Sequence, residues 1–158
     1  MSRNLTARDV MQGRVITVSP GMSLATAREI FARHRITGAP VVDENGDLVG
    51  AISQTDIARI ILQKESDDYP ENSYFIGLPA FLGGSMGIEA TNLAEQLATR
   101  TIEEAMTTDV YTVSPDDRLS VLAVTMRHHR IHRLIVVEQR RVVGIVSTLD
   151  LIQILEDH

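Results

Sequence analysis

The sequence contains an internal duplication, which constrains the fold more than any other feature. Three segments from the first third of the chain return, in the same order, in its last third. The first two pairs are 95 positions apart and the third pair is 94 apart, because the turn ENGD is one residue longer than its counterpart QRR. The chain therefore consists of two copies of about 50–60 residues joined by an insert. The matched segments are DVMQGRVITVSP (9–20) with EAMTTDVYTVSP (104–115), RITGAPVVD (35–43) with RIHRLIVVE (130–138), and LVGAISQTDI (48–57) with VVGIVSTLDL (142–151).

Each copy has the residue pattern of a β-α-β-β-α unit. Apolar side chains spaced i, i+3 and i+7 after each Ser-Pro predict a helix, and two short runs rich in β-branched residues predict a pair of strands. Asn45-Gly46 is a hairpin turn signal between the first two runs. We expect an α+β fold in which the two repeats pack with approximate twofold symmetry, because neither could bury its sheet alone. The predicted domains are repeat 1 (1–61), the insert (62–100) and repeat 2 (101–158).

The composition indicates a globular protein and excludes several other classes. Hydrophobic residues make up 44% of the chain, which is too many for a disordered segment. The net charge is −6, so we expect no general affinity for nucleic acid. The chain has no cysteine, which excludes disulfides, and no apolar run long enough to span a membrane. Because the start of the sequence lacks a signal-peptide pattern, we expect a cytoplasmic location.

One basic segment, RHHRIHR at 127–133, stands out in this acidic chain. Its first residues fall in the last turn of a predicted helix, where cations complement the helix dipole. His128 and His132 have a spacing that suits a metal ion on a helix. A strand is expected to begin at Ile131, however, so the two rings should not share a face. We therefore expect no metal site here and a small anion as the partner of the arginines.

The pattern Ser-x-x-Asp begins the second helix of each repeat. Ser53 and Asp56 form it in repeat 1, and Ser147 and Asp150 form it in repeat 2. This spacing is typical of a capping box, in which the serine accepts a backbone N–H and the acid accepts another. A carboxylate fixed at a helix N-terminus can also accept the hydroxyls of a ribose, and free N–H groups there favour phosphate. Both roles are compatible with the sequence.

The doubled pattern resembles a tandem CBS-domain pair, also called a Bateman module. The resemblance is carried by TVSP in both repeats, by RITGAPVVD and RIHRLIVVE, and by GAISQTD and GIVSTLD. It does not include the insert. It implies a stand-alone regulatory module, not an enzyme, that binds an adenine nucleotide such as AMP, ADP or ATP between the repeats. It also implies a homodimer, with no cofactor required beyond the regulatory ligand.

In this family each crevice uses residues of both repeats, which assigns residues of this chain to two sites. Crevice A joins Ser53 and Asp56 to repeat 2. There, His132 and Arg133 resemble a pair that contacts nucleotide phosphates in the regulatory γ subunit of AMP-activated protein kinase. Because Thr-Gly stands at the matching place in repeat 1, we expect crevice A to be the better nucleotide site and crevice B the weaker. The assigned residues are Ser53, Asp56, Tyr111, Ile131, His132 and Arg133 in crevice A, and Ile16, Ile36, Thr37, Gly38, Ala39, Ser147 and Asp150 in crevice B.

Other interpretations stay open. The chain is alternatively a ligand-free structural or interaction module, or a binder of another adenosyl ligand such as S-adenosylmethionine or NAD. A catalytic role is not expected, because no nucleophile–base pair is suggested by spacing. The insert contains four of the six aromatic residues and a short predicted helix over 91–99. We interpret it as a lid, a dimer contact or a docking surface for a client protein.

Overall fold

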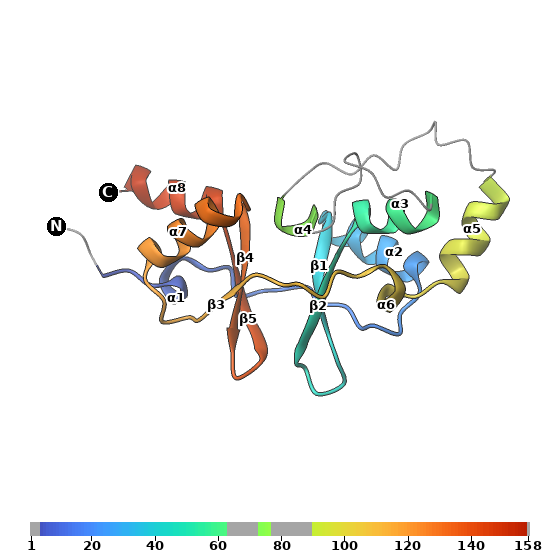
Figure 1. Ribbon diagram of the computed structural model, residues 1–158, viewed down its shortest axis with the longest axis horizontal. Coiled ribbons are helices and arrows are strands. Elements are labelled where there is room, and N and C mark those ends of the chain that lie inside the picture. Colours follow the sequence, from blue (N-terminus) through green and yellow to red (C-terminus); the bar gives the residue numbers. More distant parts are fainter. Residues whose placement is uncertain (1–3, 63–72, 77–89, 158) are drawn as a thin grey trace.

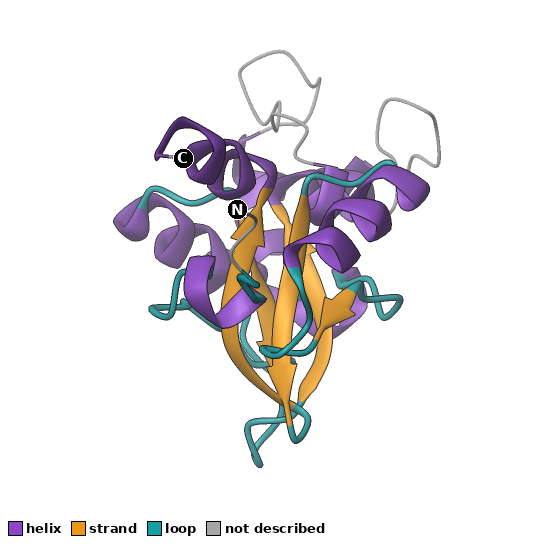
Figure 2. Ribbon diagram, turned by 90° about the vertical axis from the view of Figure 1, so that its left-hand side faces the viewer, coloured by secondary structure: helices purple, strands orange, loops and turns teal. Residues whose placement is uncertain are grey.

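The computed structural model describes residues 4–62, 73–76 and 90–157. The two repeats lie side by side, with their β-hairpins toward the middle of the molecule and most helices at the outside (Figure 1). The hairpin turns project together at one end (Figure 2). The elements are α1 (Ala7–Val10), α2 (Leu24–His34), β1 (Gly38–Val42), β2 (Leu48–Ser53), α3 (Gln54–Leu62), α4 (Ser73–Ile76), α5 (Ala90–Thr99), α6 (Ile102–Ala105), β3 (Thr112–Val113), α7 (Leu119–His129), β4 (Arg133–Glu138), β5 (Arg141–Ser147) and α8 (Thr148–Asp157).

Each repeat is built around an antiparallel hairpin. β1 pairs with β2 and β4 pairs with β5, and the register shifts at matching places, after Val41 and after Val136. In repeat 2 the short β3 adds a parallel strand beside β4. In repeat 1 the corresponding contact is an isolated bridge between Val18 and Val41. The predicted α+β fold of two β-α-β-β-α repeats is therefore confirmed, with a first strand that is shorter than expected in repeat 1.

Helix ends and turns follow from local backbone chemistry. The predicted turn between β1 and β2 contains Gly46 at φ 84°, in the left-handed region that glycine adopts without a steric penalty. Helices α2 and α7 both end at an arginine in the left-handed conformation, Arg35 at φ 54° and Arg130 at φ 55°. Glycine is the usual residue at such a position. Both repeats therefore place an arginine at the end of this helix in spite of a conformational cost.

The two repeats exchange their leading segments. The segment before the first long helix of each repeat forms an antiparallel bridge with the second hairpin strand of the other repeat. Glycines in those strands make room for a methionine from the exchanged segment. A Cβ on Gly144 would lie 2.5 Å from Met11 Sδ, and a Cβ on Gly50 would lie 2.9 Å from Met106 Sδ. The packed unit therefore combines residues of both sequence copies.

Two described helices belong to the insert. The helix expected over 91–99 is observed as α5, which packs against α2 and buries Leu97 in the core of repeat 1. Helix α4 lies near the centre of the molecule, in contact with β2 of repeat 1 and β4 of repeat 2. Residues 63–72 and 77–89 of the insert, which include GLPAFLGGSMG at 77–87, lie outside the described residues. The position of α4 decides how the two crevices differ.

Candidate functional site

Asp56 and Asp150 cap the second helix of their repeats in the same way. The Ser53 N–H donates to Asp56 Oδ2 at 2.8 Å, and the Asp56 N–H donates back to Ser53 Oγ at 3.2 Å. In repeat 2 the corresponding distances between Ser147 and Asp150 are 2.8 and 3.3 Å. The capping-box interpretation is confirmed in both repeats. Each aspartate then has one further oxygen, Oδ1, whose surroundings differ between the two sites.

The second oxygen of Asp56 is occupied within the protein. Asp56 Oδ1 accepts a hydrogen bond from Arg59 Nη2 at 2.8 Å, and the residue is 1% exposed. Burial raises the pKa of the Asp56 carboxyl above its ordinary value of 3.8, although the neighbouring Arg59 guanidinium opposes this shift. Both carboxylate oxygens therefore have protein partners, and Asp56 lines none of the three cavities described among residues 4–62, 73–76 and 90–157.

Helix α4 of the insert lies in crevice A. Ser73 Oγ is 3.1 Å from Ser53 Oγ, and the His132 N–H donates to the Phe75 carbonyl oxygen at 2.7 Å. The Phe75 ring meets the Tyr111 ring edge to face, with centroids 5.2 Å apart. Ser73, Tyr74 and Phe75 are 2%, 3% and 0% exposed, so this turn of helix is buried among the residues assigned to crevice A.

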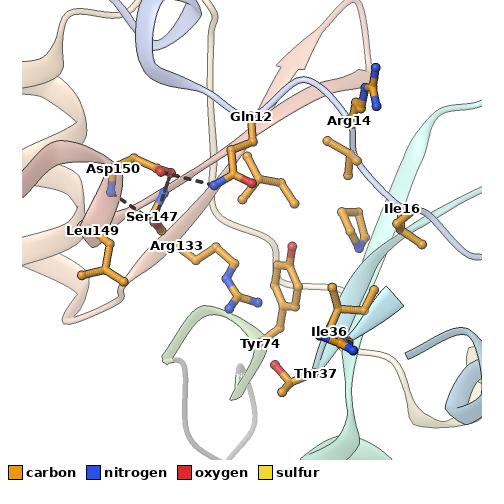
Figure 3. Close-up of a pocket in the computed structure, with 15 residues that line it drawn as sticks. Gln12, Arg14, Ile16, Ile36, Thr37, Tyr74, Arg133, Ser147, Leu149 and Asp150 are labelled. Atoms are coloured by element: carbon orange, nitrogen blue, oxygen red, sulfur yellow. Dashed lines mark hydrogen bonds between the residues drawn. The ribbon is translucent and has the colours of Figure 1, made fainter. Parts of the chain in front are cut away.

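Crevice B contains an open cavity of about 390 Å³, a size typical of small-molecule sites. Asp150 lies on one side of it, with Ile16 and Ile36 on the opposite side (Figure 3). Asp150 Oδ1 accepts a hydrogen bond from Gln12 Nε2 at 3.3 Å, across the cavity edge. Unlike that of Asp56, this carboxylate faces a space that a ligand can enter. The cavity is lined by Gln12, Arg14, Val15, Ile16, Arg35, Ile36, Thr37, Gly38, Pro40, Tyr74, Arg133, Ile145, Ser147, Leu149 and Asp150.

Arg133 lines crevice B, although its assignment from sequence was to crevice A. It pairs directly with Ser147 across the hairpin, so both side chains lie on the same face of the sheet. Its guanidinium lies over the Tyr74 ring, 4.5 Å from the centroid (Figure 3). Burial raises the pKa of Tyr74 to about 12, with Arg133 acting against this rise. The sequence-based placement of Arg133 is therefore wrong, and with it the reason for expecting crevice A to be the stronger site.

Several other residues assigned to the crevices from the sequence lie elsewhere in the structure. Ala39 does not line crevice B; it is buried in the core of repeat 1, because successive strand residues face opposite sides and Gly38 and Pro40 face the cavity. His132 and Ile131 line a shallow groove between α7 and α8. The predicted residues that the structure does bring together around crevice B are Ile16, Ile36, Thr37, Gly38, Ser147 and Asp150.

Two basic residues that line crevice B, Arg14 and Arg35, were not predicted as site residues from the sequence. Arg35 had a signal: it matches Arg130 in the duplication, and both end a helix in the left-handed conformation. Arg14 had no comparable signal, because its counterpart is Asp109. Across residues 4–62, 73–76 and 90–157, none of Arg14, Arg35 and Arg133 forms an ion pair.

In the part of the chain that the structure describes, no three His, Cys, Asp or Glu side chains gather closely enough to hold a metal ion. No helix in the same part of the chain is long and apolar enough to cross a membrane.

Comparison with known proteins gives a family match and relatives with bound ligands. The family model for the CBS domain matches residues 7–63 and 102–157. The CBS domain pair of protein MJ0100, solved in complex with 5′-methylthioadenosine and S-adenosyl-L-methionine, is 28% identical; the alignment covers 98% of both chains with a TM-score of 0.68. CBSX2 in complex with AMP is 22% identical, with 97% of both chains covered and a TM-score of 0.67, which shows a shared fold alone.

Curated relatives include longer proteins. L-aspartate semialdehyde sulfurtransferase of Methanocaldococcus jannaschii is 30% identical, and the match covers 91% of this chain but 22% of that enzyme. The chain spans less than half the length of the first curated relatives that it matches.

The burial of Asp56 predicts a specific pH dependence of stability. A carboxyl whose pKa is raised on folding contributes most to stability below its unfolded pKa of 3.8, and this contribution is lost as pH rises through the folded pKa. The free energy of unfolding of the wild type, minus that of Asp56→Asn, should therefore fall as the pH rises above about 3.8 and through the raised pKa of Asp56. Urea titrations of both proteins measure it. A difference that grows with pH would show that the Arg59 ion pair outweighs burial.

Proposed function

Because the chain belongs to the CBS domain family, we propose that it is a regulatory module that binds an adenine nucleotide in crevice B. The observation that carries this proposal is the composition of that cavity. It combines an accessible carboxylate and apolar side chains on the opposite wall with three arginine residues in its lining, of which Arg133 lies nearest Tyr74 at the centre of Figure 3. A nucleotide presents the matching set of groups: ribose hydroxyls, a base with apolar faces, and anionic phosphates.

Asp150 is the proposed partner of the ribose. The capping box fixes its Oδ2, which leaves Oδ1 pointing toward Gln12 at the cavity edge (Figure 3). A ribose hydroxyl can replace the Gln12 amide as the donor to Oδ1, and a hydrogen bond to a charged carboxylate contributes about 1.5–3 kcal/mol. Because the serine and the helix already orient the carboxylate, binding does not require this group to be ordered.

The base is proposed to lie against Ile16 and Ile36, which face Asp150 across the cavity. Apolar side chains suit the faces of a purine, and the width of the cavity is then filled by the sugar between base and Asp150. Both isoleucines are half-buried, and Ile36 also packs against the hydrophobic core of repeat 1.

Arg14, Arg35 and Arg133 are proposed to bind the phosphates. A guanidinium presents a planar set of donors that matches phosphate oxygens. The same three charges disfavour S-adenosylmethionine, which carries a sulfonium cation, although MJ0100 is a relative solved with that ligand. Ligand preference should therefore increase with the negative charge of the tail, so a nucleotide is favoured over a neutral thioadenosine.

Paired substitutions of the two aspartates test this site. Asp150→Asn should weaken the binding of AMP, ADP or ATP at least about tenfold, because it removes the charged acceptor for the ribose. Asp56→Asn, the matched change in the other repeat, should leave the affinity within about twofold, because Asp56 is closed off by Arg59 and the insert. Isothermal titration calorimetry measures both variants. Loss of binding in Asp56→Asn, with Asp150→Asn unaffected, would place the nucleotide in crevice A.

The proposed homodimer is supported by an exposed apolar face on repeat 2. Its α8 residues have buried counterparts in repeat 1: Leu155 is 77% exposed, whereas the matching Ile61 is 5% exposed. A twofold contact between two such faces would bury these side chains, because the same patch of each chain meets its copy. The exposed side chains are Val121 and Val124 on α7, and Leu149, Ile152 and Leu155 on α8.

A charge placed on this face should dissociate the dimer. Leu155→Asp is expected to give monomers in sedimentation equilibrium, whereas Gln153→Asp, an exposed position on the same helix, should leave a dimer. A wild-type protein that sediments as a monomer at all concentrations would contradict the proposal.

A further inference from the structure

We propose that residues Ser73–Phe75 are an internal ligand of crevice A, so that each chain offers one nucleotide site and not two. This inference rests on the proposed function only for what crevice B binds; the occupancy of crevice A is argued from contacts within the chain. Crevice A has the same capping box as crevice B and lies at the matching place of the duplicated fold. What distinguishes it is the presence of α4.

The polar contacts of α4 fall where a ligand hydroxyl would bind. Ser73 Oγ is 3.1 Å from Ser53 Oγ, and Ser53 Oγ in turn donates to Asp56 Oδ2 at 3.1 Å. The Ser73 hydroxyl therefore occupies the end of the capping box that faces the ligand, and it stands in for a sugar hydroxyl. The backbone of α4 adds a further bond, because the Phe75 carbonyl accepts from the His132 N–H at 2.7 Å.

The aromatic ring of Phe75 takes the position expected for a base. It is fully buried and packs edge to face on Tyr111. It belongs to the same hydrophobic cluster as Ile131, the second apolar residue assigned to this crevice. A flat ring, a hydroxyl and a carbonyl acceptor are thus presented together, which is the set of groups that a nucleoside would offer to the same walls.

Tyr74 fixes α4 at the boundary between the crevices. A Cβ on Gly38 would lie 2.8 Å from Tyr74 Cδ2, so the ring is in direct contact with that glycine. On the repeat 2 side the Arg133 guanidinium stacks on the ring. Gly38 and Arg133 are matching positions of the duplication, 95 residues apart. Tyr74 is therefore held between equivalent points of the two repeats, with Phe75 directed into crevice A and its own ring forming a wall of crevice B.

An occupant that belongs to the same chain has an advantage over a free nucleotide. Its effective concentration is set by the covalent connection and does not fall on dilution. A nucleotide could enter crevice A only by exposing the buried Ser73, Tyr74 and Phe75, whereas entry into crevice B leaves them in place. Crevice A should therefore stay closed to nucleotide at concentrations that saturate crevice B.

Binding stoichiometry tests the proposal with AMP as the probe. Calorimetry and native mass spectrometry of the wild type should give one AMP per chain. A variant with both Ser73→Gly and Phe75→Gly should bind two, and adding Asp56→Asn to that variant should return the number to one. Two AMP per wild-type chain would overturn the proposal. One AMP in a folded double-glycine variant would do so as well, because α4 would not be what closes crevice A.

Thiol labelling tests the occupancy of crevice A without any nucleotide. The chain has no cysteine, so Ser73→Cys introduces a single thiol at the buried contact. It should react with Ellman's reagent at least about a hundredfold more slowly than the thiol of Ser120→Cys, which is exposed on α7. Equal rates would show that α4 does not occupy the crevice. Slow labelling without AMP binding would support the internal ligand while refuting the proposed function, so the two failures are distinguishable.

Discussion

The close packing of a methionine from each repeat against a glycine of the other is the contact on which the rest of the structure depends. Met11 lies on Gly144 and Met106 lies on Gly50, at distances that leave no room for a side chain on either glycine. Because the exchanged segments join each repeat to the hairpin of its neighbour, the two repeats form one packed unit. The crevices between them are a consequence of that exchange. They occur as a pair because the exchange is reciprocal.

The insert breaks this twofold relation. It has no counterpart in the duplication, and it places α4 in one crevice and not in the other. The two capping boxes are equal in hydrogen-bond geometry, yet Asp56 is enclosed by Arg59 and the insert, whereas Asp150 faces a cavity. One duplicated motif therefore has two different roles. In repeat 1 it is a structural helix cap in contact with α4, and in repeat 2 the same cap is available to a ligand.

The sequence predicted the repeats, their element order and both capping boxes, since these depend on local periodicity and on matched segments. It did not predict which crevice is open. The insert could not be placed by the symmetry argument, and the direction of Arg133 depends on its cross-strand pairing with Ser147. The hairpin predicted from the sequence already implies that pairing, and so it also implies that Arg133 and Ser147 lie on the same face of the sheet. Ala39 was misassigned for a related reason, because alternation along β1 directs it to the core.

The positive charge of crevice B also could not be predicted from the sequence, because its arginines are far apart along the chain. Arg14, Arg35 and Arg133 come from three segments that the fold brings to one cavity. The basic run at 127–133 led to the expectation of an anion, which is also the kind of ligand proposed for crevice B, but only its last residue lines this site. The other two guanidiniums come from repeat 1, which the sequence had marked as the poorer source of phosphate donors. The exchange of segments is what gathers them.

A crystal structure of the protein grown with AMP would show most directly whether crevice A is filled by the chain itself while crevice B is free to bind a nucleotide. We expect electron density for one nucleotide per chain, with its sugar at Asp150, its phosphate toward the three arginines, and α4 unmoved. Density for a nucleotide against Asp56, with Ser73–Phe75 displaced from crevice A, would contradict it.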